Sequence, residues 1–495
     1  MLNLRVMVHD FPLFWFVVVF VAYTAVLFAI SYYTSRNANK NSFFGAEHKA
    51  PWPLVAYGMV GASISGVTFI SVPGNVWVQN FFYMPLVLGF VVGYIVIAKV
   101  LLPLYYKMNL TSIYTYLGER FGVKTYKTGT TVFMISRILG AAVRIFVVIV
   151  VLFSFLPRHL QESGVWMFAL IALLFLTLLY LYTYKGGVKT IIWTDALQTT
   201  FMLLAVGLTI YHICKSMDWN AKDMVEGVAS SPYVAMFDWN WGHATNAVKQ
   251  FVSGIFVTIA MTGLDQSMMQ KNLACKDIKA AQKNMYTTSI IIVVVNFFFL
   301  LLGALLCVFV SSHGGFEAMG ITKTDEMFPT IASRYFGVGL GVFFLIGLIS
   351  ASYPSAGAAL TSLTTSFCVD FLHTKEERTR KRVHAAMAAV FFVLLVGLYV
   401  LSNDAVVNLV YKLASYTYGP LLGMFFFGIL TKRKVKDGAS PYIAGASPLI
   451  CLALNVLLRR TFGFDLGFSL LIINGALTFI GLWFVSKKSD DINSR

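Results

Sequence analysis

Residues 55–77 read Val-Ala-Tyr-Gly-Met-Val-Gly-Ala-Ser-Ile-Ser-Gly-Val-Thr-Phe-Ile-Ser-Val-Pro-Gly-Asn-Val-Trp. This segment is long and apolar enough to span a membrane. Its interior glycines disfavour a continuous helix, because glycine costs about 1 kcal/mol per interior position relative to alanine. In lipid, irregular backbone is tolerated only where it is buried in protein or lines a cavity. The freed carbonyls and hydroxyls suit a dehydrated cation; close helix packing by small residues is the alternative.

The composition is that of an all-α polytopic membrane protein. Hydrophobic residues make up 58% of the 495 residues and charged residues 12%, whereas soluble domains carry about 25% charged residues. We expect the first apolar stretch to be a retained helix, because it is too long for a signal peptide and no small-residue cleavage site follows it. Thirteen stretches are long enough to span, at about 11–33, 53–79, 82–106, 128–157, 164–184, 190–213, 247–270, 285–311, 333–371, 384–402, 404–430, 440–458 and 465–486.

The net charge of +16 is distributed unevenly between alternate loops. One set of loops carries most of the Lys and Arg, including the clusters at 120–127, 271–283, 375–382 and 432–436. By the positive-inside rule this set is cytoplasmic. The sequence therefore predicts a multi-pass protein of the plasma (inner) membrane, with the N-terminus outside and the C-terminus in the cytoplasm. Because the charge follows topology, it gives no support to nucleic-acid binding.

The seventh stretch repeats the character of the second, since Ser253, Gly254, Thr258, Thr262 and Gly263 interrupt it. Paired, interrupted segments at corresponding positions of two halves indicate the midplane site of a transporter. We therefore expect one membrane transport domain built from two inverted five-helix repeats. The first repeat would cover 53–213 and the second 247–430, with peripheral helices at 11–33 and 440–486.

Several ionisable residues lie inside predicted spans, where charged side chains are costly and mark functional sites. Asp195 lies near the start of the sixth span, and an interfacial aspartate capping that helix is the alternative interpretation. Arg137 and Arg144 share one face of the fourth span. Arginine is a preferred bidentate partner for a carboxylate, so each is a candidate for substrate contact or for pairing within the bundle. Lys412, in the eleventh span, has no evident partner.

The ninth span is rich in hydroxyls around Pro354. These hydroxyls would either coordinate a cation or bond the carbonyls that the proline frees. The five cysteines are scattered without metal-binding spacing. The eight histidines do not cluster within spans, so no metal other than a transported cation and no enzymatic activity are expected.

Four stretches together resemble the sodium:solute symporter family, which contains bacterial sodium-coupled sugar, proline, pantothenate and sialic acid carriers. They occur in the family's order on a chain with thirteen predicted spans. They are Tyr114-Thr115-Tyr116-Leu117 with Arg120-Phe121-Gly122, Gly186-Gly187 with Trp193-Thr194-Asp195 and Gln198, residues 263–277 reading GLDQSMMQKNLACKD, and Gly419-Pro420-Leu421-Leu422-Gly423 with Lys432-Arg433.

The resemblance implies a leucine-transporter-like inverted-repeat fold and sodium-driven inward transport by alternating access. It also implies a sodium ion between the broken second span and the ninth span, with Asp195 as a second ligand or an exit way-station. Of the family's adjacent pair of serines, the first position is Pro354 here, which offers no side-chain ligand. The ligands implied for the sodium ion are the main-chain carbonyls of Gly61, Ile64 and Ala351, with the side chains of Ser352 and Ser355.

The resemblance further places the substrate against hydroxyls of the second span, here Ser63, Ser65 and Thr68, with Arg137 matching an arginine of the sialic acid carriers. The position that is glutamine in those carriers and glutamate in the sugar carriers falls near Val87. A small organic anion such as sialic acid or a sugar acid is therefore the first expectation. A neutral sugar or polyol is the second, and a transporter-like sensor or channel is the alternative from another class.

Overall fold

The computed structural model describes residues 12–36, 43, 50–184, 187–335, 337–401, 404–462 and 466–487. Gly186 of the predicted family motif lies outside these residues, and the side chain of Lys412 lies outside those described. Within the described part the chain is almost entirely helical, and its two strands, β1 (Lys434–Val435) and β2 (Ser486–Lys487), form one short antiparallel pair.

A helix or a bent set of helices occupies every one of the predicted spans. Within the described residues, nine helices are long and apolar enough to cross a membrane, two bent pairs each make a further span, and two shorter apolar helices lie near the C-terminus. The predicted limits differ from the observed ones by a few residues. The spans are α1 (Leu13–Ser35), α3 (Trp52–Ser63) with α4 (Gly66–Gln79), α5 (Met84–Val96) with η3 (Ile97–Leu101) and α6 (Leu102–Lys107), α8 (Val123–Ser154), α10 (Val165–Thr183), α11 (Val188–Ser216), α13 (Ala247–Thr258) with η4 (Ile259–Gly263) and α14 (Gln266–Asn272), α15 (Ile278–Ser312), α18 (Gly337–Ser366) with η7 (Phe367–Phe371), α19 (Glu377–Leu401), α20 (Asp404–Leu430), α21 (Ser440–Phe462) and α22 (Leu470–Val485).

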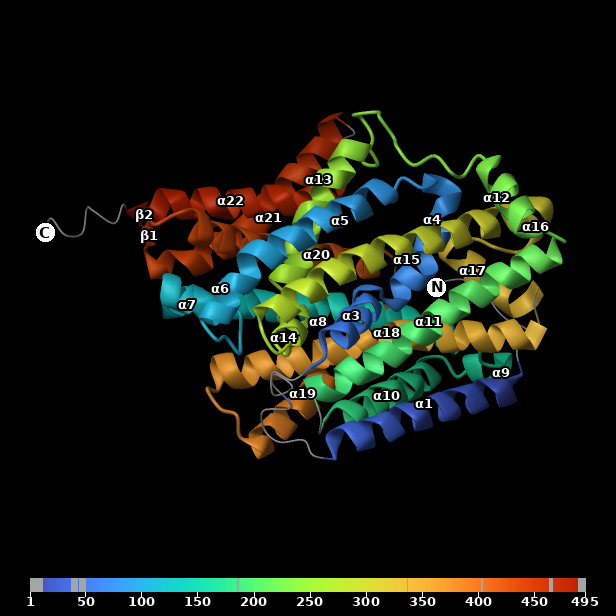
Figure 1. The fold of residues 1–495 in the computed structure, drawn as a ribbon, viewed down its shortest axis with the longest axis horizontal. Coiled ribbons are helices and arrows are strands. Elements are labelled where there is room, and N and C mark those ends of the chain that lie inside the picture. The colour runs from blue at the N-terminus through green and yellow to red at the C-terminus, as the bar shows by residue number, and fades with distance from the viewer. Residues whose placement is uncertain are drawn as a thin grey trace, which may run out of the picture.

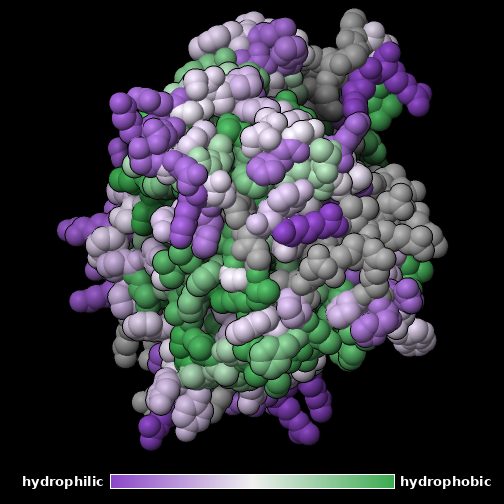
Figure 2. Space-filling view, turned by 90° about the vertical axis from the view of Figure 1, so that its right-hand side faces the viewer, coloured by the Kyte–Doolittle hydropathy of each residue, from purple (hydrophilic) through white to green (hydrophobic). Residues whose placement is uncertain are grey.

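The short elements gather at the two ends of the bundle. In Figure 1, α12, α16 and the long loop before α13 lie at one end, and α7 lies with the strand pair at the other. Figure 2 looks onto the first of these ends and shows hydrophilic side chains in scattered groups with hydrophobic side chains between them. The short elements are α7 (Thr115–Arg120), α9 (Arg158–Gln161), α12 (Ala221–Ala229), α16 (Gly315–Ala318), η5 (Thr324–Glu326), α17 (Met327–Thr330), η6 (Ile331–Tyr335), η8 (Asp437–Ala439) and η9 (Gly467–Ser469).

Helix α11 packs against both α18 and α3. Helices α5 and α13 approach almost backbone to backbone, at Gly89 and Gly254. A methyl group on Gly254 would collide with the carbonyl of Leu86, and one on Gly89 with the carbonyl of Phe251. Small residues that let two backbones meet are a common means of joining helices in lipid. These glycines are therefore packing residues.

We expect Gly254→Ala to destabilise the protein by about 1–3 kcal/mol, because overpacking a close contact forces backbone shifts. Thermal unfolding of the detergent-solubilised protein measures this as a lower Tm. The matched control is Gly207→Ala in α11, where an added Cβ meets nothing within 4 Å and alanine is the better helix former. Equal Tm values for the two variants would contradict the close-packing role.

Candidate functional site

The second span breaks at Ile64 and Ser65, as the sequence predicted. Both residues have extended backbones, and α3 and α4 meet at an angle of 61°. Ser65 caps α4 through a capping box, in which its hydroxyl accepts from the Thr68 N–H and the Thr68 hydroxyl accepts from the Ser65 N–H, both at 3.4 Å. Local hydrogen bonding therefore favours a helix start at this point and a separate half-helix on each side.

The break leaves main-chain acceptors bare in the protein interior. Among the described residues, no hydrogen bond ends on the carbonyl oxygens of residues 61–64. Gly61 and Ala62 are buried, and Ile64 is only 2% exposed. Buried carbonyls are almost always bonded, so this group fits a ligand that accepts electron pairs from oxygen, and a dehydrated cation is such a ligand.

The seventh span also breaks, at Leu264 and Asp265, and its halves meet at 72°. Here protein hydroxyls satisfy the freed carbonyls. The Tyr105 hydroxyl donates to the carbonyl of Gly263 and the Tyr114 hydroxyl to that of Leu264, each at 2.9 Å. The two breaks are therefore chemically unlike, and the bare carbonyls favour the first break as the cation site.

The ninth span faces the first break through buried small residues. Ala351, Ser352 and Ser355 are at most 3% exposed, and a methyl group on Gly66 would meet the Ser352 hydroxyl. The Ser352 hydroxyl donates to the carbonyl of Leu348 at 2.6 Å, while the Ser355 hydroxyl makes a long contact of 3.5 Å to the Ser352 carbonyl. The Ser355 hydroxyl is therefore held less firmly by the protein than the Ser352 hydroxyl. Both serines lie on α18, the ninth span, where the family resemblance implies a sodium ligand.

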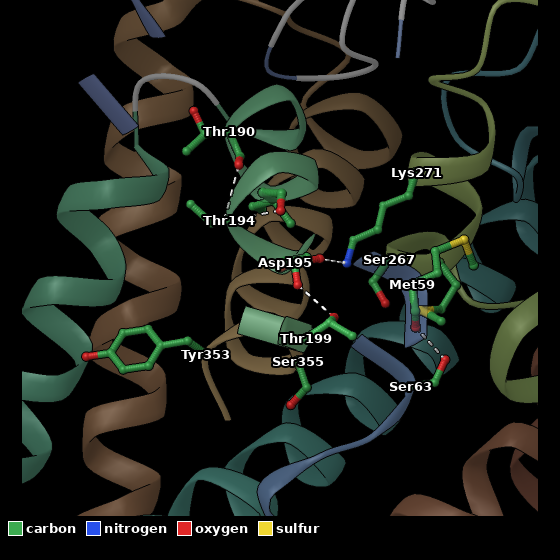
Figure 3. Close-up of polar contacts among 12 residues, drawn as sticks. Met59, Ser63, Thr190, Thr194, Asp195, Thr199, Ser267, Lys271, Tyr353 and Ser355 are labelled. Atoms are coloured by element: carbon green, nitrogen blue, oxygen red, sulfur yellow. Dashed lines mark hydrogen bonds and ion pairs between the residues drawn. The ribbon is translucent and has the colours of Figure 1, made fainter. Parts of the chain in front are cut away.

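Asp195 lies in α11 as a fully buried carboxylate and not at a wet interface. Its Oδ2 forms an ion pair with the ammonium of Lys271 in α14, and its Oδ1 has no hydrogen-bond partner among the described residues. Figure 3 shows the Lys271 side chain reaching across to Asp195, with Ser267 nearby and Tyr353 pointing away. The interfacial alternative for Asp195 is therefore wrong, and the pair joins the sixth span to the broken seventh.

Arg137 lies buried in α8 and faces the second break. Its guanidinium Nη1 is 3.5 Å from Asp265 Oδ2, and its Nη2 is 3.4 Å from the carbonyl of Ser355. Asp265 also accepts from the Tyr418 hydroxyl at 2.7 Å and caps α14 through the Ser267 N–H at 2.8 Å. The Nε of Arg137 has no partner in the part of the chain that the structure describes. The contacts of Arg137 with Asp265 and Ser355 are long for charge-assisted hydrogen bonds, so the guanidinium keeps donor capacity.

The remaining predicted substrate contacts are hydroxyls of the broken second span, and each makes a hydrogen bond within that span. The Ser63 hydroxyl donates to the carbonyl of Met59 at 2.8 Å (Figure 3), and Ser65 and Thr68 serve the capping box. Ser63 and Thr68 are partly exposed. The structure brings these hydroxyls together at the break, and their contact with a solute stays a prediction.

Sequence reasoning did not assign Lys271, Asp265 or Tyr418 to the site. The basic pattern predicts that Lys271 lies in a loop, which is wrong, since it is 2% exposed within α14. The signal that could have found it was the interruption of the seventh span itself. If the break lies at Asp265, the residues that follow form a second buried half-helix and not a loop.

The fold and the paired breaks define a class of protein, the secondary transporters with a leucine-transporter-like inverted repeat. The model of the sodium:solute symporter family matches residues 43–445, and the chain belongs to this family. It is accordingly a sodium-coupled symporter of a small solute and a multi-pass plasma membrane protein, and not an enzyme. The family resemblance read from the sequence is confirmed.

Relatives of known name agree with this assignment. The chain is 22% identical to the sodium/sialic acid symporter SiaT of Proteus mirabilis (strain HI4320), with 95% of this chain and 94% of SiaT aligned. It is also 22% identical to the human sodium-coupled monocarboxylate transporter 1, over 86% of this chain and 70% of the relative.

Solved structures show the same fold. A substrate-bound, outward-open Na+-coupled sialic acid symporter superposes with a TM-score of 0.78 at 19% identity, covering 97% of this chain and all of the other. The nucleobase-cation-symport-1 transporter MHP1 in a closed conformation gives a TM-score of 0.55 at 15% identity, over 90% of this chain and 95% of the other.

Proposed function

We propose that this symporter carries a small organic anion into the cell, such as sialic acid or a sugar acid. The single observation that carries the proposal is the Arg137 guanidinium, which is buried, held by long contacts and left with an Nε that is unpartnered within the described residues. An unsatisfied buried donor costs free energy until an acceptor reaches it. A carboxylate accepts from two adjacent guanidinium N–H groups at once, so it is the acceptor that suits this side chain.

The named relatives support an acidic solute, since they are called sialic acid symporters and monocarboxylate transporters. The pairing of Asp265 with Arg137 favours the second candidate, a neutral sugar or polyol. The Asp265 carboxylate already offsets the arginine charge, so a neutral hydroxylated solute would enter without adding a net charge to the site. Ser63, Ser65 and Thr68 would serve either solute, by offering hydroxyls to its polar groups.

For sodium, we propose the first break as the binding place. The carbonyls of Gly61 and Ile64 would coordinate the ion together with the Ala351 carbonyl and the hydroxyls of Ser352 and Ser355. The bare carbonyls of the break support this assignment. Asp195 would serve the same ion, as a second ligand or as a way-station on its exit. Pro354 supplies no side-chain oxygen, so main-chain carbonyls carry more of the coordination than two adjacent serines would require.

The membrane orientation is also a proposal, and it rests on the basic loops. The N-terminus would lie outside and the C-terminus in the cytoplasm, which puts α3 and α14 in the cytoplasmic half of the protein. Each sodium ion entering the cell would then contribute about 2.3 kcal/mol per 100 mV of membrane potential. Solute and ion would be linked because each stabilises the same closed arrangement of the broken spans.

Transport by purified protein in proteoliposomes tests the proposed function. A sodium gradient is expected to drive uptake of labelled sialic acid or a sugar acid, and solute-loaded vesicles to show counterflow. Thermal-shift measurements against sugars, sialic acids and other carboxylates, with and without sodium, select the solute to label. Stabilisation by neutral sugars alone would overturn the anion proposal, and the absence of counterflow would indicate a sensor or a channel.

We expect Ser355→Ala to raise the half-saturating sodium concentration about tenfold, since a single oxygen ligand comparable to a hydrogen bond is worth about 1 kcal/mol or slightly more. Sodium titrations of uptake and of thermal stability both measure this change. The matched control is Ser362→Ala in the same helix, a buried hydroxyl that donates to the Ala359 carbonyl at 3.1 Å. A sodium response that is the same in both variants would remove Ser355 from the ion site.

A further inference from the structure

The Asp195–Lys271 pair lies where three elements of the cytoplasmic half converge. Lys271 belongs to α14, the half-helix after the second break, and Asp195 to α11; the two side chains are 3% and 0% exposed. The third element is α3, the half-helix before the first break. An added Cβ on its Gly58 would lie 3.1 Å from the Cβ of Asp195. The pair is therefore enclosed between the inner halves of both broken spans.

The two inner half-helices are also tied to each other. The N–H of Ala50, just before α3, donates to the carbonyl of Ala274, just after α14, at 3.0 Å. Asn272 of α14 contacts Met59 of α3, its Nδ2 lying 3.6 Å from the sulfur. Figure 1 shows α3 and α14 next to each other near the middle of the bundle. The Lys271–Asp195 pair then connects this joined unit to α11.

An exit path that opened between α11 and the two half-helices α3 and α14 would separate Lys271 from Asp195. Separating two buried opposite charges without water would leave each one unpaired in a medium of low dielectric constant, which is strongly unfavourable. The pair can therefore part only as water enters, so closure of the inner half and pairing of Lys271 are one event. Once parted, the Asp195 carboxylate becomes a free anion on the inner side of the first break.

We propose that Lys271 is a positioning residue which holds Asp195 in the closed inner gate and releases it to the departing sodium ion when that gate opens. With the inner half closed, the ammonium occupies Oδ2 of Asp195. With the inner half open, sodium and the carboxylate meet without competition from the lysine. The sodium part of this inference and the cytoplasmic side of the gate rest on the proposed function, while the gate itself depends on the geometry of the pair.

Natural cysteines report on the gate. Cys275 lies three residues after the end of α14 and Cys307 lies in α15, and both are 0% exposed. With a membrane-impermeant thiol reagent on the purified protein and mass spectrometry of each cysteine, Lys271→Met is expected to raise Cys275 labelling about tenfold in the absence of sodium. Cys307 labelling should stay at the wild-type rate, and Lys271→Arg should restore the slow labelling of Cys275.

Lys271→Met leaves the buried Asp195 carboxylate unpaired and could therefore misfold. A second variant controls for this. Asp195→Asn combined with Lys271→Gln removes both charges and leaves none unpaired. It is expected to label faster at Cys275 as well, with a circular dichroism spectrum like that of the wild type. Wild-type labelling of Cys275 in both variants would overturn the gate, and so would equally raised labelling of Cys275 and Cys307 in the double variant.

Sodium titration tests the release step. Because Asp195 would no longer be occupied in Lys271→Met, the sodium concentration that gives half-maximal thermal stabilisation is expected to fall about tenfold. The solute concentration for half-maximal stabilisation should change less than threefold. A rise in the sodium value would overturn the release step. The two failures are distinguishable. If sodium stabilises neither the wild type nor any variant, the proposed sodium site fails, whereas the difference in Cys275 labelling without sodium still reports the gate.

Discussion

Arg137→Ala is expected to lower uptake of an acidic solute at least 100-fold. A bidentate guanidinium–carboxylate contact contains two charge-assisted hydrogen bonds, each worth about 1.5–3 kcal/mol, and 1.4 kcal/mol is a factor of ten in an equilibrium constant. The variant lacks both the pairing with Asp265 and the free Nε that we assign to the solute. Initial rates of labelled sialic acid or sugar acid uptake into proteoliposomes measure the effect, in parallel with a neutral sugar.

Two further variants separate solute binding from support of the fold. Arg144→Ala removes the same side chain from the same helix, two turns away, and should keep most of the uptake. Arg137→Ala combined with Asp265→Asn removes the carboxylate that the single variant leaves unpaired. If Arg137 holds the solute, this double variant stays inactive; recovered uptake would show that the arginine serves only to neutralise Asp265. Unchanged transport by Arg137→Ala alone would remove the anion proposal.

The parts of the fold that sequence reasoning predicted are those set by local chemistry. Hydropathy located the spans because each one must cover the same thickness of lipid. The break in the second span was predictable because its glycines weaken the helix locally, and Ser65 with Thr68 supplies the cap for a new start. The same argument predicted an interruption of the seventh span among residues 253–263. The structure places the break just beyond them, at Leu264 and Asp265, where Asp265 caps the second half.

The pairing of charges was not predictable, because it depends on which spans become neighbours. Lys271 sits in a run of basic residues that hydropathy places in a loop, yet α14 buries it against α11. Asp265 and Arg137 belong to different predicted repeats and meet only in the folded bundle. The two breaks were alike in sequence, and only the structure shows that tyrosine hydroxyls satisfy the second while, among the described residues, the carbonyls of the first stay bare.

Because their carbonyls are satisfied differently, the two broken spans offer different chemical groups to a ligand. The first break offers oxygen ligands and no charge. The second offers charge, through Asp265 and through Lys271 one half-helix further on. Asp195 and Arg137, each from an unbroken helix, pair with charges of the second break. A cation entering the first break therefore approaches carboxylates that are already paired, and its binding depends on how firmly those pairs hold.

Asp195→Ala is expected to weaken sodium dependence much more than solute recognition, because Asp195 lies beside α3 and pairs with Lys271, whereas Arg137 pairs with Asp265. Removing a carboxylate ligand from the path of a cation costs about 1.5–3 kcal/mol, which corresponds to a rise of roughly 10–100-fold in the half-saturating sodium concentration. The solute KM at saturating sodium should change less than threefold. Sodium and solute titrations of uptake into proteoliposomes give both values.

The control for Asp195→Ala is Asp370→Asn, which alters another buried carboxylate that is bonded by the hydroxyls of Ser112 and Tyr126 at 2.8 and 2.7 Å. If the loss of any buried carboxylate changed sodium binding, both variants would shift the sodium response. If Asp195 serves the ion, only its own variant does. Equal sodium dependence in wild-type and Asp195→Ala vesicles would show that Asp195 has only a structural role. Sodium binding would then depend on the carbonyls of the first break and the hydroxyls of α18.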